Sequence, residues 1–219
     1  MAILQLENVC YSYDSKKIAV LDNINYEFEN GKIYAITGRS GAGKTTLLSL
    51  LSGLTNPTSG KILYKGKDIA KEDKYKYRSN AVGVIFQSFN LLTNLTAVEN
   101  VVLSMDISKQ KYHNKKEMAI SLLKKVGLED TEINRPVLKL SGGQQQRVAV
   151  ARALSYNPEI ILADEPTGNL DPETQDEIME IFSLLAKEEN RCIIIVTHSP
   201  DVAKRSDINY QLQPIRKKQ

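Results

Sequence analysis

Uninterrupted runs of apolar residues occur at three well-separated places in the chain. They are Ile33–Ile36, Ile160–Ala163 and Cys192–Val196, and none of them alternates with polar positions. A strand inside a parallel sheet is buried on both faces, so its apolar residues follow one another directly. The three runs therefore predict a parallel sheet at the centre of the fold.

A different pattern precedes the first run. Ile3, Leu6 and Val9 are spread through one segment, and residues 18–28 alternate in part between apolar and polar positions. Such partial alternation between turn-forming residues is typical of strands with one buried face. We expect the first 30 residues to form strands and turns.

Helical periodicity fills the intervals between the apolar runs. Residues 44–52 form one helical segment. Another begins at Asp171 and Pro172, a pair suited to the N-cap and the first position of a helix. Its apolar positions are Ile178, Ile181, Phe182 and Leu185. A further helix upstream has apolar positions at Ala119, Leu122, Leu123 and Val126.

The alternation of buried runs and helices predicts an α/β core. Residues from about 90 to 140 contain no buried-strand run, which indicates a helical subdomain inserted into that core. No internal repeat, low-complexity segment or linker divides the sequence. We therefore expect residues 1–219 to form a single domain.

Composition narrows the function classes without naming one. The 219 residues carry 29 Lys and Arg against 26 Asp and Glu, a formal net charge of +3, which is too small to argue for a nucleic-acid partner. The longest stretch without a polar side chain, Ala81–Phe86, which is interrupted by Gly83, is far shorter than the roughly 20 residues of a spanning helix. The N-terminus has no signal-peptide pattern, and Cys10 and Cys192 have no metal-ligand spacing, so we expect reduced thiols in the cytoplasm.

The most informative motif follows the first apolar run. Residues 38–45 satisfy G-x-x-x-x-G-K-[ST], with a strand before and a helix after, as the phosphate-binding P-loop requires. Glycines let successive N–H groups point inward, and the helix N-terminus adds positive charge. Lys44 is expected to reach the β- and γ-phosphates and Thr45 to bind Mg²⁺. The alternative is a glycine-rich turn that matches by chance. The motif consists of Gly38, Arg39, Ser40, Gly41, Ala42, Gly43, Lys44 and Thr45.

Polar side chains follow the second and third apolar runs. Asp164 and Glu165 come directly after one, at the sheet edge where α/β proteins bind ligands. Asp164 is expected to hold Mg²⁺ and Glu165 to polarise the attacking water, the alternative being an exposed acidic turn. His198 follows the other run and would open onto the same edge, where it could contact a γ-phosphate or serve as a structural histidine.

A second candidate anion site lies at residues 140–147, where a serine and two glycines open another helical pattern. Alone, Ser141 could simply cap a helix. One P-loop holds one nucleotide, however, so a second such site suggests a phosphate offered by another molecule.

Leu140–Gln144 resembles the signature motif of ABC-type ATPases, and the rest of the chain to about residue 212 fits that family in order. Residues 38–45 match its Walker A motif, Ile160–Asp164 its Walker B motif, and Asn169–Asp171 its D-loop. The resemblance implies a P-loop NTPase (RecA-like) core with an N-terminal antiparallel β subdomain and an inserted helical subdomain. It implies that Glu165, His198 and Gln87 take part in catalysis, and that Thr45, Gln87 and Asp164 bind Mg²⁺. The Walker A residues and Thr46 would bind ATP. The signature that acts on the partner's ATP would consist of Ser141, Gly142, Gly143 and Gln144, and Asp171 would belong to the D-loop.

An aromatic residue that stacks on adenine is also implied. Tyr13 occupies that position, with Tyr11 as a near competitor.

The same resemblance implies a head-to-tail dimer, with ATP held between Walker A of one chain and Ser141 and Gly143 of the other. One complete set of motifs favours a homodimer of ATPase subunits, with a permease as a separate membrane-spanning chain and the ATPase at the cytoplasmic face of the membrane. Gly168 and Asn169, together with Phe86–Leu92, resemble the macrolide-exporter, lipoprotein-release and antimicrobial-peptide-resistance group. The alternative is an ABC ATPase that regulates a membrane-bound signalling or cell-wall hydrolase complex without translocating a substrate.

Overall fold

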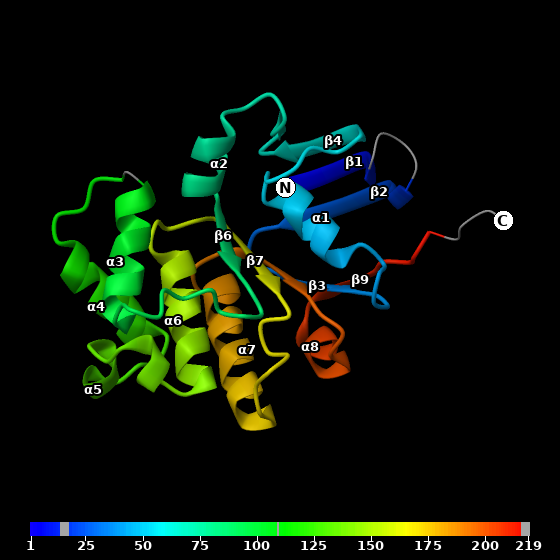
Figure 1. Ribbon diagram of the computed structural model, residues 1–219. Helices are drawn as coiled ribbons and strands as arrows, with labels where there is room; N and C mark the ends of the chain where they lie inside the picture. The colour runs from blue at the N-terminus through cyan, green and yellow to red at the C-terminus, as the bar shows by residue number, and fades with distance from the viewer. Residues whose placement is uncertain (14–17, 109, 216–219) are drawn as a thin grey trace.

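The expected parallel sheet forms the centre of the molecule. A computed structural model describes residues 1–13, 18–108 and 110–215 (Figure 1). The sheet has five strands, paired in parallel in the order β6-β7-β8-β3-β9. Their bounds are β6 (Val82–Ile85), β7 (Ile160–Asp164), β8 (Cys192–Val196), β3 (Ile33–Thr37) and β9 (Ile208–Gln211). The three apolar runs are thus neighbouring inner strands, and this prediction is confirmed.

The two faces of this sheet bury different side chains. Ile193 and Ile195 of β8 belong to one core cluster, whereas Cys192, Ile194 and Val196 belong to the other. Since successive side chains on a strand point to opposite faces, a strand covered on both sides needs apolar residues at every position. This arrangement explains why the runs are continuous.

The first face packs against helices that carry two of the candidate motifs. Helices α6 (Gly142–Leu154) and α7 (Pro172–Lys187) share the core cluster of Ile193 and Ile195. Asp171 caps α7 and Pro172 is its first residue, as the sequence predicted. The short helix α8 (Pro200–Arg205) follows β8.

The second face packs against α1 (Lys44–Leu51) and a smaller antiparallel sheet. The strand order of that sheet is β2-β1-β4-β5. Its strands are β1 (Ala2–Tyr13), β2 (Ile18–Glu29), β4 (Ser59–Tyr64) and β5 (Lys67–Asp68). Leu4, Leu6 and Phe28 of this sheet share one core cluster with Leu47 and Leu50 of α1. The implied antiparallel subdomain is therefore present.

A helical arm projects on the side of β6, at the left of Figure 1. It contains α3 (Ala97–Ser108), α4 (Lys115–Lys125), α5 (Asp130–Ile133) and the 3₁₀ turn η1 (Val137–Lys139), while α2 (Lys74–Asn80) precedes β6. Backbone hydrogen bonds from Ala97 N to Arg135 O and from Val137 N to Leu95 O join its two ends. The arm thus leaves and re-enters the core at one place.

No helix in the described part of the chain combines the length and the apolar character needed to cross a bilayer. Cys10 and Cys192 are both free thiols.

Candidate functional site

The loop between β3 and α1 bends through two glycines with positive φ. Gly41 has φ of 79°, and Gly43, the N-cap of α1, has φ of 95°. Residues other than glycine rarely adopt such φ angles. A Cβ on Gly43 would also lie 2.9 Å from Cγ1 of Val20. Residue 43 is therefore a glycine for both conformational and steric reasons.

The loop presents unpaired donors to one side. Among the described residues, no protein acceptor is bound by the N–H groups of Gly41, Gly43, Lys44 and Thr45. The Lys44 ammonium folds over the loop and donates to the carbonyl oxygen of Gly38 at 2.8 Å. Free N–H groups at a helix N-terminus, together with a lysine, fit the phosphates of a nucleotide.

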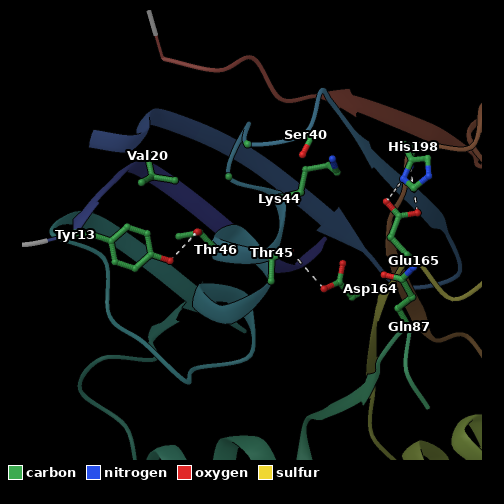
Figure 2. A pocket seen from close by; sticks show the side chains of 12 residues that line it. Tyr13, Val20, Ser40, Lys44, Thr45, Thr46, Gln87, Asp164, Glu165 and His198 are labelled. Atoms are coloured by element: carbon green, nitrogen blue, oxygen red, sulfur yellow. Dashed lines mark hydrogen bonds and ion pairs between the residues drawn. The ribbon is translucent and has the colours of Figure 1, made fainter. Parts of the chain in front are cut away.

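A cavity of about 720 Å³ opens beside this loop. Figure 2 shows Tyr13 and Val20 at one end, Lys44 and Thr45 in the middle, and the residues that follow β7 and β8 at the other end. The lining residues are Tyr13, Val20, Ser40, Gly41, Gly43, Lys44, Thr45, Thr46, Gln87, Asp164, Glu165 and His198. Every one of them except Val20 is a residue singled out from the sequence.

Three residues of the loop lie outside this lining. Ala42 is buried in the core beneath the loop. Gly38 and Arg39 line a neighbouring hollow together with residues 211–214.

A hydroxyl and a carboxylate lie close together in the cavity. Thr45 Oγ1 donates to Asp164 Oδ2 at 3.5 Å. Burial raises the pKa of Asp164, and the negative charge of Glu165 raises it further. No group of three His, Cys, Asp or Glu side chains with metal-binding geometry occurs among the described residues. Two oxygen ligands fit Mg²⁺, which usually takes its remaining ligands from water and phosphate.

Glu165 turns back from the end of β7 to meet the end of β8. Its φ is 46°, and its backbone N–H donates to Val196 O. Its carboxylate lies 2.6 Å from Nδ1 of His198 and also accepts from the backbone N–H of His198 and from the Thr197 hydroxyl. The Glu165 side chain is 11% exposed and that of His198 is 71% exposed. His198 therefore opens onto the same edge as the carboxylates, as the sequence predicted.

Tyr13 stands at the opposite end of the cavity. Its hydroxyl lies 3.1 Å from Oγ1 of Thr46, and its ring is half exposed. Tyr11 packs edge-on against Tyr13, with ring centroids 5.1 Å apart, but is not part of the lining. This arrangement favours Tyr13 over Tyr11 for the stacking role, which stays a prediction. Val20 was missed because no feature of the sequence links β2 to the phosphate loop.

The signature residues lie at the start of α6 and do not line this cavity. Ser141 is the exposed N-cap of α6: its Oγ accepts from the backbone N–H of Gln144, whose side chain accepts from the backbone N–H of Ser141. A Cβ on Gly143 would lie 2.5 Å from Cγ2 of Thr174 in α7. Thr174 in turn donates to the Asp171 carboxylate. Thr174 of α7 thus links the signature to the D-loop residue Asp171, and Gly142 is exposed beside them.

A phosphate loop that joins an inner strand of a parallel sheet to a helix, facing carboxylates from the neighbouring strand, defines a P-loop nucleoside triphosphatase. The sequence pattern of the ABC transporter family matches residues 21–168. The chain belongs to the ABC transporter family. It is an ATP-binding subunit of that family and an ATPase.

Comparison with individual proteins agrees with this assignment. The chain is 46% identical over 212 residues to the uncharacterized ABC transporter ATP-binding protein YclH of Bacillus subtilis, covering 97% of this chain and 94% of YclH. It is 42% identical to the methionine import ATP-binding protein MetN 2 of Enterococcus faecalis, covering 94% of this chain and 60% of MetN 2.

Solved structures show the same fold. The dimeric structure of MJ0796, a bacterial ABC transporter cassette, is 36% identical with a TM-score of 0.86, and 97% of each chain is covered. A second MJ0796 structure is a dimeric post-hydrolysis state with bound ADP and phosphate, and its TM-score is 0.87 at the same identity and coverage. The chain therefore has the architecture of an ABC cassette.

Proposed function

We propose that two copies of this chain form a head-to-tail dimer, with each ATP lying between the phosphate loop of one copy and Ser141 and Gly143 of the other. The observation that carries the proposal is that the two candidate phosphate sites, the loop before α1 and the start of α6, lie apart in one chain. The cavity beside α1 has no lining residue from the described start of α6, while Ser141 is exposed at a helix N-terminus. MJ0796 is dimeric, which supports a dimer of this chain.

Within each site, the chain's own groups would divide the chemistry of hydrolysis. Lys44 and the free N–H groups of the loop bind the phosphates, and Tyr13 stacks on the adenine. Thr45, Asp164 and Gln87 would hold Mg²⁺, which neutralises phosphate charge when bound. Glu165 takes a proton from the attacking water as the new oxygen–phosphorus bond forms and the bond to ADP breaks. His198 contacts the γ-phosphate.

We further propose that residues 1–219 act as one domain that drives a separate membrane-spanning permease at the cytoplasmic face of the membrane. The helical arm that follows Gln87 is the proposed docking region. Gly168, Asn169 and the sequence Phe86–Leu92 support export or mechanotransmission of the macrolide-exporter and lipoprotein-release type.

Complementation between two defective chains tests the shared site. Lys44→Ala removes the phosphate ligand of one partner, and Ser141→Arg blocks the surface that the other partner offers. Each variant alone should have very low ATPase activity. A mixture should recover activity, because a mixed dimer contains one site with both an intact Lys44 and an intact Ser141.

The matched control carries both substitutions in one chain. Mixed with either single variant, the doubly substituted chain cannot form a site with both residues intact, so activity should stay low. A mixture of the single variants that remains inactive while ATP still binds the Ser141→Arg chain would contradict the head-to-tail dimer.

Recovery of the chain from gently solubilised membranes tests the coupling to a permease. Identification of a co-purifying membrane-spanning protein would support the proposal, and its extracytoplasmic part would distinguish transport from regulation of a hydrolase. A chain that never sediments with membranes would contradict it.

A further inference from the structure

Arg152 of α6 makes contacts that the proposed chemistry does not use. It lies about three turns beyond Ser141 on the same helix. Its guanidinium donates to two backbone carbonyls, those of Asn90 and Phe89, the latter at 2.8 Å from Nη2. In residues 1–13, 18–108 and 110–215, no carboxylate forms an ion pair with it. Burial lowers the pKa of Arg152, because a charged group is less stable away from water. The hydrogen bonds to the two carbonyls compensate for this loss of solvation.

The two carbonyls belong to an unusual turn directly after Gln87. Phe89 has φ of 57° and Asn90 has φ of 51°. For residues other than glycine, the left-handed backbone conformation raises the free energy of the folded state by about 1–2 kcal/mol per residue. Surrounding contacts must compensate for this strain. Besides Arg152, the turn is closed by a hydrogen bond from Phe89 N to Phe86 O. Arg152 thus holds the part of the segment nearest Gln87, at Phe89 and Asn90, while Asn100 of α3 bonds Leu92 further along.

The same part of α6 is also fixed to β6, the strand that leads to Gln87. A Cβ on Gly83 would lie 2.7 Å from the carbonyl oxygen of Ala153. Just beyond the end of α6, the Tyr156 hydroxyl donates to Val82 O at 2.8 Å. The start of β6 and the turn after Gln87 are therefore both attached to the end of α6, whose other end follows Ser141.

We propose that Arg152 is a positioning residue for Gln87: by holding the Phe89–Asn90 turn, it couples the position of α6 to the place of Gln87 in the nucleotide cavity. The inference rests on the proposed role of Gln87 in hydrolysis. A guanidinium is suited to this task because its planar fork of donors can reach two carbonyl oxygens at once, whereas an ammonium is a compact point charge. A movement of the signature helix would then shift Gln87 in the same chain.

Arg152→Lys tests this coupling, because it keeps the charge and removes the fork. We expect kcat for ATP hydrolysis to fall about tenfold, since small misplacements of catalytic groups have effects of this order. The affinity for ATP should change by less than about twofold, because the Lys44 cradle is a separate part of the cavity. A general loss of structure would instead change the ATP affinity and the melting temperature together.

A double-mutant cycle with Gln87→Ala identifies the residue through which Arg152 acts. If Arg152 positions Gln87, Arg152→Lys should lower kcat in the native chain and have no further effect in the Gln87→Ala chain. Arg78→Lys is the matched control, because Arg78 of α2 also donates to a backbone carbonyl, that of Gly53 at 3.1 Å, away from the turn and the cavity. It should leave kcat unchanged in both backgrounds.

Two results would overturn the inference, and they differ from each other. If Gln87→Ala lowers kcat and Arg152→Lys lowers it again by the same factor, only the coupling is wrong. If Gln87→Ala leaves kcat unchanged, the proposed role of Gln87 is wrong and the coupling fails with it. If the melting temperature of Arg152→Lys lies far below that of the native chain, Arg152→Gln replaces it in the same double-mutant cycle. The glutamine amide can still donate to one carbonyl, and the expected outcome is the same.

Discussion

The imidazole Nδ1 of His198 lies 2.6 Å from Oε1 of Glu165, so the residues that follow two neighbouring strands share a hydrogen bond. The other carboxylate oxygen of Glu165 accepts from the backbone of His198 and the hydroxyl of Thr197. The turn after β8 thereby orients the carboxylate that follows β7. The proposed base for water attack and the group proposed to contact the γ-phosphate thus lie together.

Glu165→Gln should bind ATP but hydrolyse it poorly. The amide keeps the shape of the side chain and cannot take the proton, so turnover is expected to fall by about 10² to 10⁴. Phosphate release measures the turnover, and size-exclusion chromatography with ATP should show a stable dimer. Glu159→Gln is the control, because Glu159 precedes β7 and pairs with Lys65 outside the cavity. Near-normal turnover of Glu165→Gln would contradict the role of this carboxylate.

His198→Ala should lower turnover while ATP binding persists. The substitution removes the side chain that orients Glu165, and a loss of about tenfold or more is expected from misplacement of a catalytic group. Steady-state kinetics and the binding of a fluorescent ATP analogue separate the two effects. The second histidine provides the control: His113→Ala should behave as the native chain. Equal rates for the two variants would exclude the role of His198.

Lys44→Ala should weaken ATP binding itself. A hydrogen bond from a charged group contributes about 1.5–3 kcal/mol, which corresponds to roughly a 10- to 100-fold loss of affinity. Isothermal titration calorimetry of the isolated chain measures this loss. Lys204→Ala, on the exposed surface of α8, should retain native affinity. Unchanged affinity of the Lys44 variant would count against the phosphate cradle.

Asp164→Asn should stabilise the chain in a metal-free, nucleotide-free buffer at neutral pH. The pKa of Asp164 is higher in the folded chain than its ordinary value, because of burial and the charge of Glu165. Its favourable contribution to folding is therefore complete below the ordinary Asp pKa of about 3.9 and is lost as pH rises through the folded value. At neutral pH the ionised carboxylate opposes folding.

The melting temperature of Asp164→Asn should accordingly exceed that of the native chain near neutral pH, and the difference should shrink as the pH is lowered. Asp201→Asn, at an exposed position of α8, should show no such trend. A native chain that melts higher than Asp164→Asn at neutral pH would contradict this assignment of sign.

Gly143→Ala should disturb the packing of the signature against Thr174, the residue that bonds Asp171 of the D-loop. The added Cβ would lie 2.5 Å from Cγ2 of Thr174, a β-branched side chain with little freedom to move. We expect a lower melting temperature and lower ATPase activity. Thr174→Ser removes that methyl group and keeps the hydroxyl that donates to Asp171, so it should restore much of both properties. A double variant as impaired as Gly143→Ala would indicate another cause.

Much of the central fold could be predicted because its signals are local. The runs on β3, β7 and β8 and the Asp171–Pro172 start of α7 each depend on adjacent residues. By contrast, β6 contains Gly83, and the edge strand β9 has only four residues that alternate between half-buried and exposed. The strand order β6-β7-β8-β3-β9 depends on pairing between distant segments, which no local pattern specifies.

The site divides in the same way. Gly41, Gly43, Lys44 and Thr45 form a contiguous motif whose geometry follows from its spacing. The approach of Val20 to Gly43 joins β2 to the loop and depends on how one sheet packs on the other. Contacts such as that of Arg152 with the turn at Phe89 exist only in the assembled fold, so sequence patterns could not reveal them.

The phosphate loop follows a strand, β3, whose two neighbours come from much later in the chain. β3 lies between β8 and β9, and the carbonyl oxygen of Leu212 would come within 2.5 Å of a Cβ on Gly38. On the ribosome, the residues of the loop therefore emerge long before the strands that must flank them. We therefore expect stable nucleotide binding to begin only after β8 and β9 have been synthesised and have paired with β3.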